Sequence, residues 1–417
     1  MKKSISGAHG ALLLLLGINL FNYIDRQILA ALEPDIRASF FASNDVNAMT
    51  KTGLYLGSAF FVTYMISAPI LGLLADRFSR WIIVGSAVIL WSLASGGSGF
   101  AATFAILFAT RICVGIGEGG YGPAAPTILS DLFPIEIRGR IMAIFCAAIP
   151  VGSALGYVIG GLVGAHLGWR WAFYFVAPPG LLLGLLCFWQ RDPRVGEHHL
   201  VQKSPRRSLA DYLRLFRTRS YVINCIAQTL MTFVVGGLGF WVPAYLRYRN
   251  QSPDVGMTIF GLITVVAGLV STLLGGVIAD RLRSRFAGSY FWVSGIGMLI
   301  ACPFFIVTLY SPFPAAWLPM FLAIFFLFLN TGPSNTALAN VSLPAVRATA
   351  FAVNIFVIHA FGDVQAFWLL GYIGGHTNMH VAFLFVSGII FISGLAWLIG
   401  AKYLPADTAA AETAGLN

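Results

Sequence analysis

The sequence predicts an all-α membrane protein in which twelve transmembrane helices form two six-helix bundles. Of the 417 residues, 58% are hydrophobic and only 10% are charged, whereas soluble domains carry about 25% charged residues. Twelve apolar segments are long enough to cross a bilayer, which takes roughly 20 residues. A polar stretch divides these segments into six and six, and a short sequence recurs in both halves. These observations together define the fold class.

The apolar segments follow one another at short intervals. Their approximate centres are residues 20, 63, 90, 115, 152, 180, 233, 267, 299, 327, 360 and 390. The longest polar connection covers residues 191–219, within which we interpret residues 209–216 as a short amphipathic helix at the membrane surface. We expect a six-helix bundle over residues 1–190, a cytoplasmic linker over 191–219, a second bundle over 220–404 and a tail over 405–417.

The basic residues indicate the orientation of the chain. Of the 26 Lys and Arg residues, 19 fall on one predicted side of the membrane, five on the other and two inside it. Cytoplasmic loops carry the excess of positive charge, so both termini and the linker should be cytoplasmic. Because these residues are spread over short loops, the net charge of +10 is explained without a nucleic-acid partner.

A loop sequence recurs in the two halves. Residues Gly72–Arg80 read GLLADRFSR and residues Gly276–Arg283 read GVIADRLR, with an offset of 204 residues, which indicates a duplicated unit. The acid can meet the positive end of a neighbouring helix, and the arginines can hold helix ends together. The alternative is an ordinary positively charged loop. The residues assigned to a cytoplasmic gate are Asp76, Arg77, Arg80, Asp280 and Arg281.

Four charged residues interrupt two of the apolar segments, Asp25 and Arg26 in the first and Arg111 and Glu118 in the fourth. Each costs on the order of 3 kcal/mol in a bilayer centre, so such groups are paired and usually functional. Arg111 and Glu118 are two helical turns apart and share a face. Asp25 and Arg111 should lie at similar depth, which predicts that they pair. The alternative is a static ion pair between helices.

We assign Asp25 and Glu118 as proton carriers. Low dielectric disfavours a charged carboxylate and a neighbouring arginine favours it, so movement of the arginine would load or release a proton. Arg26 and Arg111 are the charge partners, and either could instead hold a substrate phosphate or other headgroup. The candidate substrate-cavity residues are Asn22, Tyr23, Tyr121, Asn335, His359 and Asp363.

Two further patterns have a structural alternative. Gly152, Gly156, Gly160 and Gly161 have a spacing that lets helices approach closely, and we interpret them as packing residues. Asp363 is the acid within the membrane part of the second half, where it follows His359; a hydrogen-bonded structural group is the alternative.

Other classes of protein lack support. The five cysteines lie in apolar segments without a CxxC pair, and no metal-ligand spacing is visible, so we expect no cofactor. An intramembrane enzyme would need a nucleophile and base, and a sensor would need a signalling domain. Neither is evident in the sequence, although both stay as alternatives of another class.

Several strings resemble the spinster family of the major facilitator superfamily. NYIDR at residues 22–26 looks like helix 1 of that family, and RICVGIGEGGYGPAAPTILSDLFP from Arg111 looks like its helix 4. GPSNTALANVSLPAVRATAFAVNIFVIHAFGD, ending at Asp363, is similar to its helices 10 and 11. The resemblance implies the major facilitator fold and proton-coupled export or facilitation of amphiphilic lipids.

The expected function is therefore proton-coupled transport of a lysophospholipid-like or sphingosine-phosphate-like molecule by alternating access, with a substrate site near the membrane midplane. A major facilitator carrier of organic anions or drugs is the alternative. The expected partners are the amphiphilic substrate, protons and membrane lipids. We expect a monomer in a bacterial inner membrane.

Overall fold

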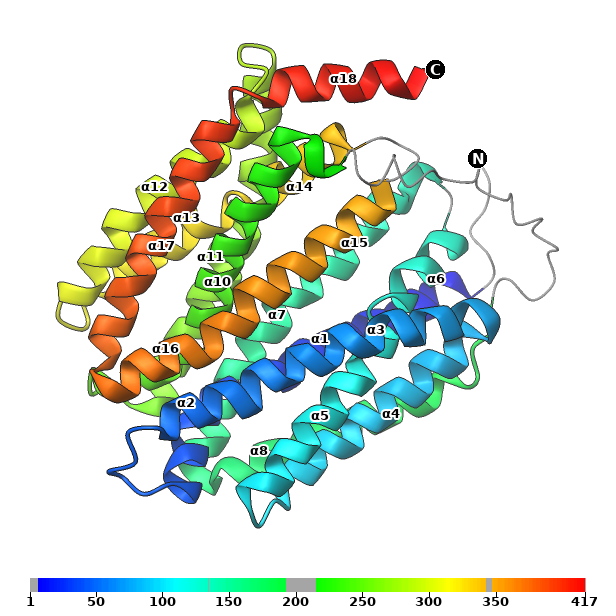
Figure 1. Ribbon diagram of the computed structural model, residues 1–417. Helices are drawn as coiled ribbons and strands as arrows, with labels where there is room; N and C mark the ends of the chain where they lie inside the picture. Colours follow the sequence, from blue (N-terminus) through cyan, green and yellow to red (C-terminus); the bar gives the residue numbers. More distant parts are fainter. Residues whose placement is uncertain (1–6, 134, 193–214, 343–346, 417) are drawn as a thin grey trace. The chain divides into compact units, whose positions relative to one another are not determined.

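The computed structural model describes residues 7–133, 135–192, 215–342 and 347–416, where every regular element is helical (Figure 1). Twelve helices in this part of the chain are long and apolar enough to cross a membrane. Each contains one of the predicted segment centres, so the twelve-span prediction is confirmed. Most of the predicted linker lies outside the described residues, including residues 209–214 of its expected surface helix.

The chain divides into two compact units. Unit 1 contains residues 1–200 and 239–265, and unit 2 contains residues 201–238 and 266–417. The predicted bundles follow chain order, whereas residues 239–265 come from the second half of the sequence and pack in unit 1. The boundary between the units therefore falls inside a helix, not only in the linker.

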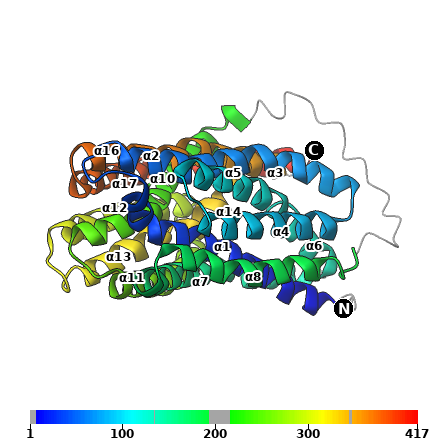
Figure 2. The ribbon, with the colours of Figure 1, turned by 90° about the horizontal axis from the view of Figure 1, so that it is seen from below.

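The first six spans belong to unit 1. Their helices are α1 (Ala8–Phe40), α2 (Ala48–Thr52), η1 (Gly53–Ser58), α3 (Ala59–Arg77), α4 (Arg80–Gly99), α5 (Phe104–Tyr121), α6 (Ala124–Leu132), α7 (Ile135–Leu167) and α8 (Trp169–Cys187). α2, η1 and α3 together make the second span, and α5 and α6 make the fourth. α5 packs against both α3 and α4, and the three lie side by side in both views (Figures 1 and 2).

Small residues bring α7 onto α1, as the sequence predicted. A Cβ atom on Gly152 would lie 2.6 Å from the Leu20 carbonyl oxygen, and one on Gly156 would lie 2.6 Å from the Ile24 carbonyl oxygen. Contacts this short leave no room for a side chain, so glycine is required where the two backbones meet. The prediction that this motif serves helix packing is confirmed.

The last six spans belong to unit 2, except that residues 239–265 of the seventh and eighth spans pack in unit 1. Their helices are α10 (Arg219–Tyr248), α11 (Pro253–Arg283), α12 (Ser289–Tyr310), α13 (Trp317–Phe328), α14 (Thr331–Val341), α15 (Arg347–Ile358), η3 (His359–Asp363), α16 (Val364–His376) and α17 (Met379–Gly400). The expected tail forms a further helix, α18 (Leu404–Leu416). The Asp407 carboxylate accepts a hydrogen bond of 2.8 Å from the Ser220 amide at the start of α10, which ties α18 to that helix end.

Proline divides the fourth and tenth spans at matching places. Pro123 follows α5, and Pro333 lies in the first turn of α14, just after α13 has ended. Proline lacks the amide hydrogen that continues a helix. Gly72 packs on Pro123, and Gly276 packs on Gly332 beside Pro333. These two glycines open the repeated loop sequences, so the matching contacts agree with a duplicated six-helix unit.

The distribution of polarity is that of a membrane protein. Large apolar side chains are exposed along the helices, for example Leu73 (66%) and Leu273 (70%). Charged side chains such as Asp25 and Arg111 are buried instead. Exposed apolar area of this extent requires an apolar surrounding, which a bilayer supplies.

Candidate functional site

The four charged residues that the sequence singled out in the first and fourth spans gather inside unit 1. α1 carries Asp25 and Arg26, and α5 carries Arg111 and Glu118. Asp25, Arg111 and Glu118 are each at most 3% exposed. α5 is placed by its glycines: a Cβ atom on Gly117 would lie 2.9 Å from the Ala87 carbonyl oxygen of α4. The close approach of α5 to its neighbours sets the position of its charges.

Arg26 and Glu118 form the ion pair between α1 and α5. The Arg26 Nε donates to Glu118 Oε2 at 2.6 Å, and its Nη2 lies 2.5 Å from the same oxygen. The Glu118 side chain is fully buried, whereas that of Arg26 is 20% exposed. Arg26 is therefore the member of the group that an incoming molecule can reach.

Aromatic rings surround the Arg26 guanidinium. Its central carbon lies 5.1–5.7 Å from the ring centres of Tyr23, Phe60, Phe61 and Tyr64. Rings at this distance attract a cation through their electron-rich faces. They stabilise the charge of Arg26 without neutralising it, because they contribute no formal negative charge.

Asp25 and Arg111 are held by serines of α4. The Ser95 hydroxyl donates to Asp25 Oδ1, and Arg111 Nη2 donates to the Ser98 hydroxyl at 2.9 Å. Ser95 and Ser98 are three residues apart and lie on one face of α4. Among the described residues no Asp25–Arg111 ion pair within 4.0 Å is formed. The predicted pairing of Asp25 with Arg111 was therefore wrong: Arg26 and Glu118 form the ion pair between the two spans, and Asp25 and Arg111 are each hydrogen-bonded to a serine of α4.

Asp25 and Glu118 each keep one carboxylate oxygen without a hydrogen-bond partner among the described residues. Within the described part of the chain, Asp25 Oδ2 and Glu118 Oε1 accept no hydrogen bond, and Arg111 Nε donates none. A buried polar atom left in this way calls for an explanation, such as a bound water or a transferred proton. An oxygen of this kind can receive a proton without breaking an existing hydrogen bond.

The other candidate residues on α1 and α5 differ in their surroundings. Asn22 is 3% exposed, and its side-chain amide interacts with the Glu118 carboxyl, although its Nδ2 makes no hydrogen bond of ordinary geometry among the described residues. Tyr23 is partly buried beside Arg26. Tyr121 is 4% exposed and its hydroxyl donates to the Leu15 carbonyl oxygen at 2.9 Å, so it connects α5 to α1.

The candidate residues of unit 2 form a separate group. His359 Nδ1 and Asp363 Oδ2 are 2.5 Å apart on the π-helical segment η3. Asp363 lies against Gly236 of α10, where a larger residue would collide with its carboxyl group. Asn335 is exposed, and its amide donates to the Thr331 carbonyl oxygen of its own helix at 2.8 Å. These contacts bring His359 and Asp363 together, whereas Asn335 is held by its own helix.

The described gate residues have different surroundings. Arg80 is buried, and its guanidinium contacts Asp131 (2.7 Å) and Asp192 (3.0 Å). Asp280 is exposed and accepts a hydrogen bond of 2.9 Å from the Tyr290 hydroxyl. Arg281 is exposed. The side chains of Asp76 and Arg77 at the end of α3 lie outside the described residues.

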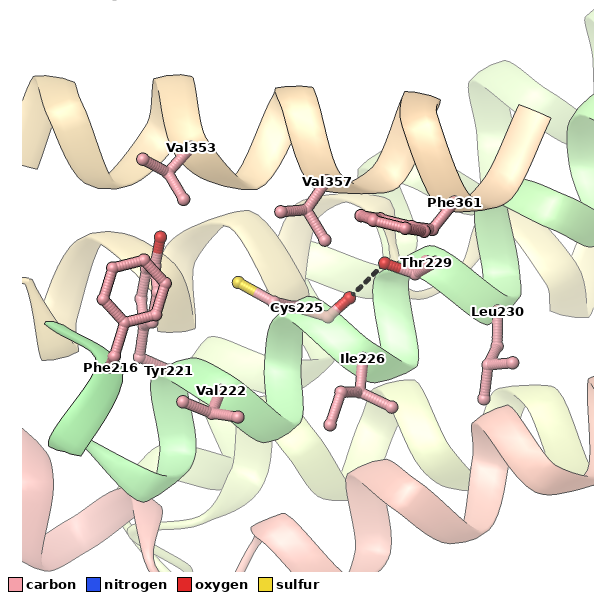
Figure 3. A pocket seen from close by; sticks show the side chains of 10 residues that line it. All are labelled: Phe216, Tyr221, Val222, Cys225, Ile226, Thr229, Leu230, Val353, Val357 and Phe361. Atoms are coloured by element: carbon pink, nitrogen blue, oxygen red, sulfur yellow. Dashed lines mark hydrogen bonds between the residues drawn. The ribbon is translucent and has the colours of Figure 1, made fainter. Parts of the chain in front are cut away.

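An apolar pocket of about 340 Å³ lies between α10 and the α15–η3 segment of unit 2 (Figure 3). The hydroxyl groups in its lining already donate hydrogen bonds to the backbone. The Thr229 hydroxyl donates to the Cys225 carbonyl oxygen at 2.7 Å, and the Tyr221 hydroxyl donates to the Ala350 carbonyl oxygen at 2.9 Å. The pocket therefore suits a hydrocarbon group. It is lined by Phe216, Tyr221, Val222, Cys225, Ile226, Thr229, Leu230, Val353, Val357 and Phe361.

The sequence reasoning missed several of these partners. Ser95 and Ser98 could have been found as hydroxyls one turn apart in the third span. A further buried carboxyl, that of Glu33, lies near the end of α1 and was not predicted. Glu33 accepts hydrogen bonds from Thr52 (2.7 Å) and Arg37 (2.9 Å).

Comparison with known proteins agrees with this architecture. The family model of the Major Facilitator Superfamily matches residues 15–363. Protein spinster homolog 3 of Danio rerio is 33% identical over an alignment of 430 positions, which covers 95% of this chain and 85% of the relative. Protein spinster homolog 1 of Homo sapiens is 34% identical, with 85% and 71% covered. A sphingosine-1-phosphate transporter of Xenopus tropicalis is 32% identical, with 85% and 71% covered.

Solved structures show the same fold. A bacterial homologue of the human lysosomal transporter Spinster, in an inward-facing and unoccupied conformation, superposes with a TM-score of 0.81 at 21% identity, covering 98% of both chains. A D-xylose–proton symporter superposes with a TM-score of 0.69 at 20% identity, covering 94% of this chain and 96% of the symporter. The chain therefore belongs to the spinster family of the major facilitator superfamily and is a membrane transporter rather than an enzyme.

Proposed function

We propose that the chain is a proton-coupled secondary transporter that moves an amphiphilic, lipid-like molecule across a bacterial inner membrane by alternating access. The observation that carries this proposal is the group of four charged side chains buried in unit 1. Ionisable groups inside membrane spans are costly and mark transport or proton pathways. Both termini and the central linker face the cytoplasm in this proposal.

Asp25 and Glu118 carry the protons. Each has one oxygen without a hydrogen-bond partner among the described residues, so each can be protonated in place. The four charges sum to zero when both carboxyls are ionised. Protonation of one leaves a net positive charge in a low-dielectric surrounding, which favours either release of the proton or entry of an anionic group.

Arg26 is the contact for a negatively charged headgroup. It is partly exposed, and its guanidinium can form two parallel hydrogen bonds to a phosphate. Arg111 is 2% exposed and is held by its hydrogen bond to Ser98, so it acts as a fixed positive charge. A headgroup that draws Arg26 away from Glu118 leaves that carboxylate unpaired and so favours its protonation, which couples substrate binding to proton uptake.

The apolar pocket of unit 2 supports an amphiphilic substrate. Its volume of about 340 Å³ is within the usual range for small-molecule sites, and its polar atoms are already hydrogen-bonded. A relative described as a sphingosine-1-phosphate transporter supports the same class of molecule. Asn22, Tyr23, Tyr121, Asn335, His359 and Asp363 stay candidates for the substrate cavity. Asp76, Arg77, Arg80, Asp280 and Arg281 stay candidates for the cytoplasmic gate.

Transport in liposomes tests the proposal. The purified protein is reconstituted with a pH-sensitive dye inside the vesicles, and lysophospholipids, a sphingosine phosphate, organic anions and amphiphilic drugs are added in turn. We expect a lipid-like substrate to move and to carry a proton flux that depends on an imposed pH gradient. Transport of organic anions or drugs alone would favour the alternative carrier function, and lipid movement without proton flux would refute the coupling.

A further inference from the structure

A polar pocket of unit 2 lies where the C-terminal helix α18 meets the ends of three membrane spans. Its volume is about 180 Å³, and α18 lies across this end of unit 2 (Figure 1). The lining comes from the end of α11, the start of α12, the end of α14 and the first turns of α18, and it includes Arg283, Ala287, Tyr290, Asn340 and Thr408. A guanidinium, an amide and two hydroxyl groups therefore surround one small cavity, in contrast to the apolar pocket beside α10.

A buried tyrosine organises the charged side of this pocket. Tyr290 is 4% exposed, and its hydroxyl donates to Asp280 Oδ1 at 2.9 Å. The central carbon of the Arg283 guanidinium lies 5.8 Å from the centre of the Tyr290 ring. An aromatic ring at this distance attracts a cation without neutralising it. Because Arg283 is exposed, its positive charge is held at the pocket and stays accessible.

The two repeats differ at a position that affects the charge of this region. Asp131 is the next-to-last residue of α6, and it contacts Arg80 at 2.7 Å. Asn340 is the next-to-last residue of α14, which is the matching part of the tenth span. A carboxylate repels an anion, whereas the side-chain amide of asparagine can donate a hydrogen bond to one. The second repeat therefore admits an anion at a place where the first repeat contains a carboxylate of its own.

Basic residues outnumber acidic ones around the pocket. Three exposed arginines follow one another closely at the end of α11, namely Arg281, Arg283 and Arg285. Beside the start of α18, the Arg219 guanidinium carbon and the Lys402 Nζ lie 5.2 and 4.8 Å from the centre of the Tyr403 ring. The Asp407 carboxylate accepts a hydrogen bond from the Ser220 amide, so it is directed toward the start of α10. The local charge favours an anionic ligand.

The surface next to the pocket suits a lipid better than a soluble anion. Phe286 precedes the lining residue Ala287 and is 58% exposed. Ile278 of α11 and Trp292 of α12 are also exposed, on the two spans that the pocket adjoins. Exposed apolar side chains of this kind contact hydrocarbon in a bilayer. A lipid can therefore place its headgroup in the pocket and keep its acyl chains beside α11 and α12.

We propose that this pocket binds the phosphate headgroup of an anionic membrane lipid, with Arg283 as the charge contact and Asn340 and Thr408 as hydrogen-bond donors. Basic pockets between helices at a membrane surface bind such headgroups. The bound lipid connects α18 to the ends of α12 and α14 and so stabilises the position of the C-terminal helix. The site lies wholly within unit 2 and uses none of the four charged residues of unit 1.

Lipid titration in a neutral detergent tests the charge contact. Phosphatidylglycerol or phosphatidylcholine is added to the purified protein, and bound lipids are counted by native mass spectrometry. The parent should bind phosphatidylglycerol more tightly, and Arg283→Gln should weaken that binding about fivefold, the effect of one basic residue at an anionic lipid surface. Arg217→Gln is the matched control, because Arg217 is exposed in unit 2 but does not line the pocket. It should leave the affinity unchanged.

Filling the pocket tests its shape without changing any charge. Ala287 is exposed in the lining, so Ala287→Phe should block the headgroup while the protein still folds. Ala410→Phe adds the same bulk at an exposed position of α18 outside the lining and should bind lipid as the parent does. The proposal would be overturned if neither Arg283→Gln nor Ala287→Phe weakened binding, or if the two control variants weakened it as much.

Hydrogen exchange distinguishes a lipid from a soluble anion and locates the effect. At a phosphatidylglycerol concentration ten times the dissociation constant, amide exchange in residues 405–416 should slow about tenfold, because bound ligand suppresses opening in proportion to its occupancy. Ala287→Phe should abolish this protection, and inorganic phosphate at the same concentration should not produce it. Equal protection by inorganic phosphate would make the occupant a soluble anion. Lipid binding that leaves the exchange of these residues unchanged would place the lipid elsewhere, and either result would overturn the proposal.

Discussion

Adjacent residues of α1 have different electrostatic partners. Asp25 accepts a hydrogen bond from the neutral Ser95 hydroxyl, whereas Arg26 forms an ion pair with Glu118. Consecutive helical residues point about 100° apart, so the two charges face different neighbours. Asp25 can therefore change its protonation state without breaking an ion pair, whereas a change at Glu118 alters the pairing of Arg26.

Asp25→Asn should abolish proton-driven transport while the protein still folds. Asparagine has nearly the shape of aspartate and can keep the bond to Ser95, but it cannot exchange a proton. Proton flux and substrate uptake under an imposed pH gradient are measured in liposomes, with the size-exclusion profile as a check of folding. Near-normal coupled transport by a well-folded variant would remove Asp25 from the list of proton carriers.

Arg26→Ala should lower stability more than Arg26→Ala combined with Glu118→Gln. Removal of the guanidinium leaves a buried carboxylate unpaired, which typically costs about 3–5 kcal/mol, and the neutral amide removes most of that cost. Thermal unfolding in detergent measures both variants. As a control, Asp25→Asn should not rescue Arg26→Ala, because Asp25 lies outside the Arg26–Glu118 ion pair. Equal rescue by Asp25→Asn would contradict the pairing seen in the structure.

At the level of helices, the glycine pattern predicted which residues make a close helix contact, whereas the charge pattern did not predict which charges form an ion pair. The GxxxGxxxGG spacing of α7 predicted close helix contact, and α7 packs on α1 through these residues. Hydropathy correctly placed Arg111 and Glu118 inside the fourth span, and their spacing predicted that they share a helix face. The spacing could not say which α1 charge each would meet, since that depends on the rotation of α1 about its axis. The partners of Asp25 and Arg111 are instead Ser95 and Ser98 of α4, which a comparison of charged residues alone does not consider.

Gly156→Ala should destabilise the protein by about 1–3 kcal/mol, the usual cost of forcing extra atoms into a packed contact. The new methyl group would lie 2.6 Å from the Ile24 carbonyl oxygen, so α7 and α1 must move apart. Gly388→Ala is the matched control, because a Cβ atom at Gly388 in α17 meets no atom within 4 Å. It should be neutral or slightly stabilising. Equal melting temperatures for the two variants would contradict the packing argument.

Arg80→Gln should destabilise unit 1 far more than Asp131→Asn. Arg80 and Asp192 are 4% and 2% exposed, so loss of the guanidinium removes the positive charge beside a buried carboxylate, which keeps its hydrogen bond from the Arg80 amide, and costs about 3 kcal/mol. Asp131 is 45% exposed and can be solvated when its charge partner is changed. Melting temperatures of the two variants in detergent provide the comparison. Similar losses for both would mean that the Arg80–Asp192 bond carries little of the stability.

For the whole molecule, composition and hydropathy were sufficient to predict the fold. Twelve apolar segments predicted twelve helices, and the resemblance to the spinster family was confirmed by relatives that cover most of the chain. Two features could not be read from the sequence: residues 239–265 pack in unit 1, and the expected tail forms α18. Both depend on contacts between residues far apart in the chain, which hydropathy does not encode.

The same hydropathy and charge pattern predicts the orientation of the whole chain, which thiol labelling can test. Nineteen of the 26 basic residues fall on the predicted side that carries both termini, so that side should be cytoplasmic. Ser43 is exposed in the connection between α1 and α2, one span away from the N-terminus, and Thr413 is exposed on α18. Each is replaced by cysteine, as Ser43→Cys and Thr413→Cys. In a background without native cysteines, an impermeant maleimide should label Ser43→Cys in intact cells and Thr413→Cys only after permeabilisation. The reverse pattern would place the termini outside, and the positive charges would then need an explanation other than membrane orientation.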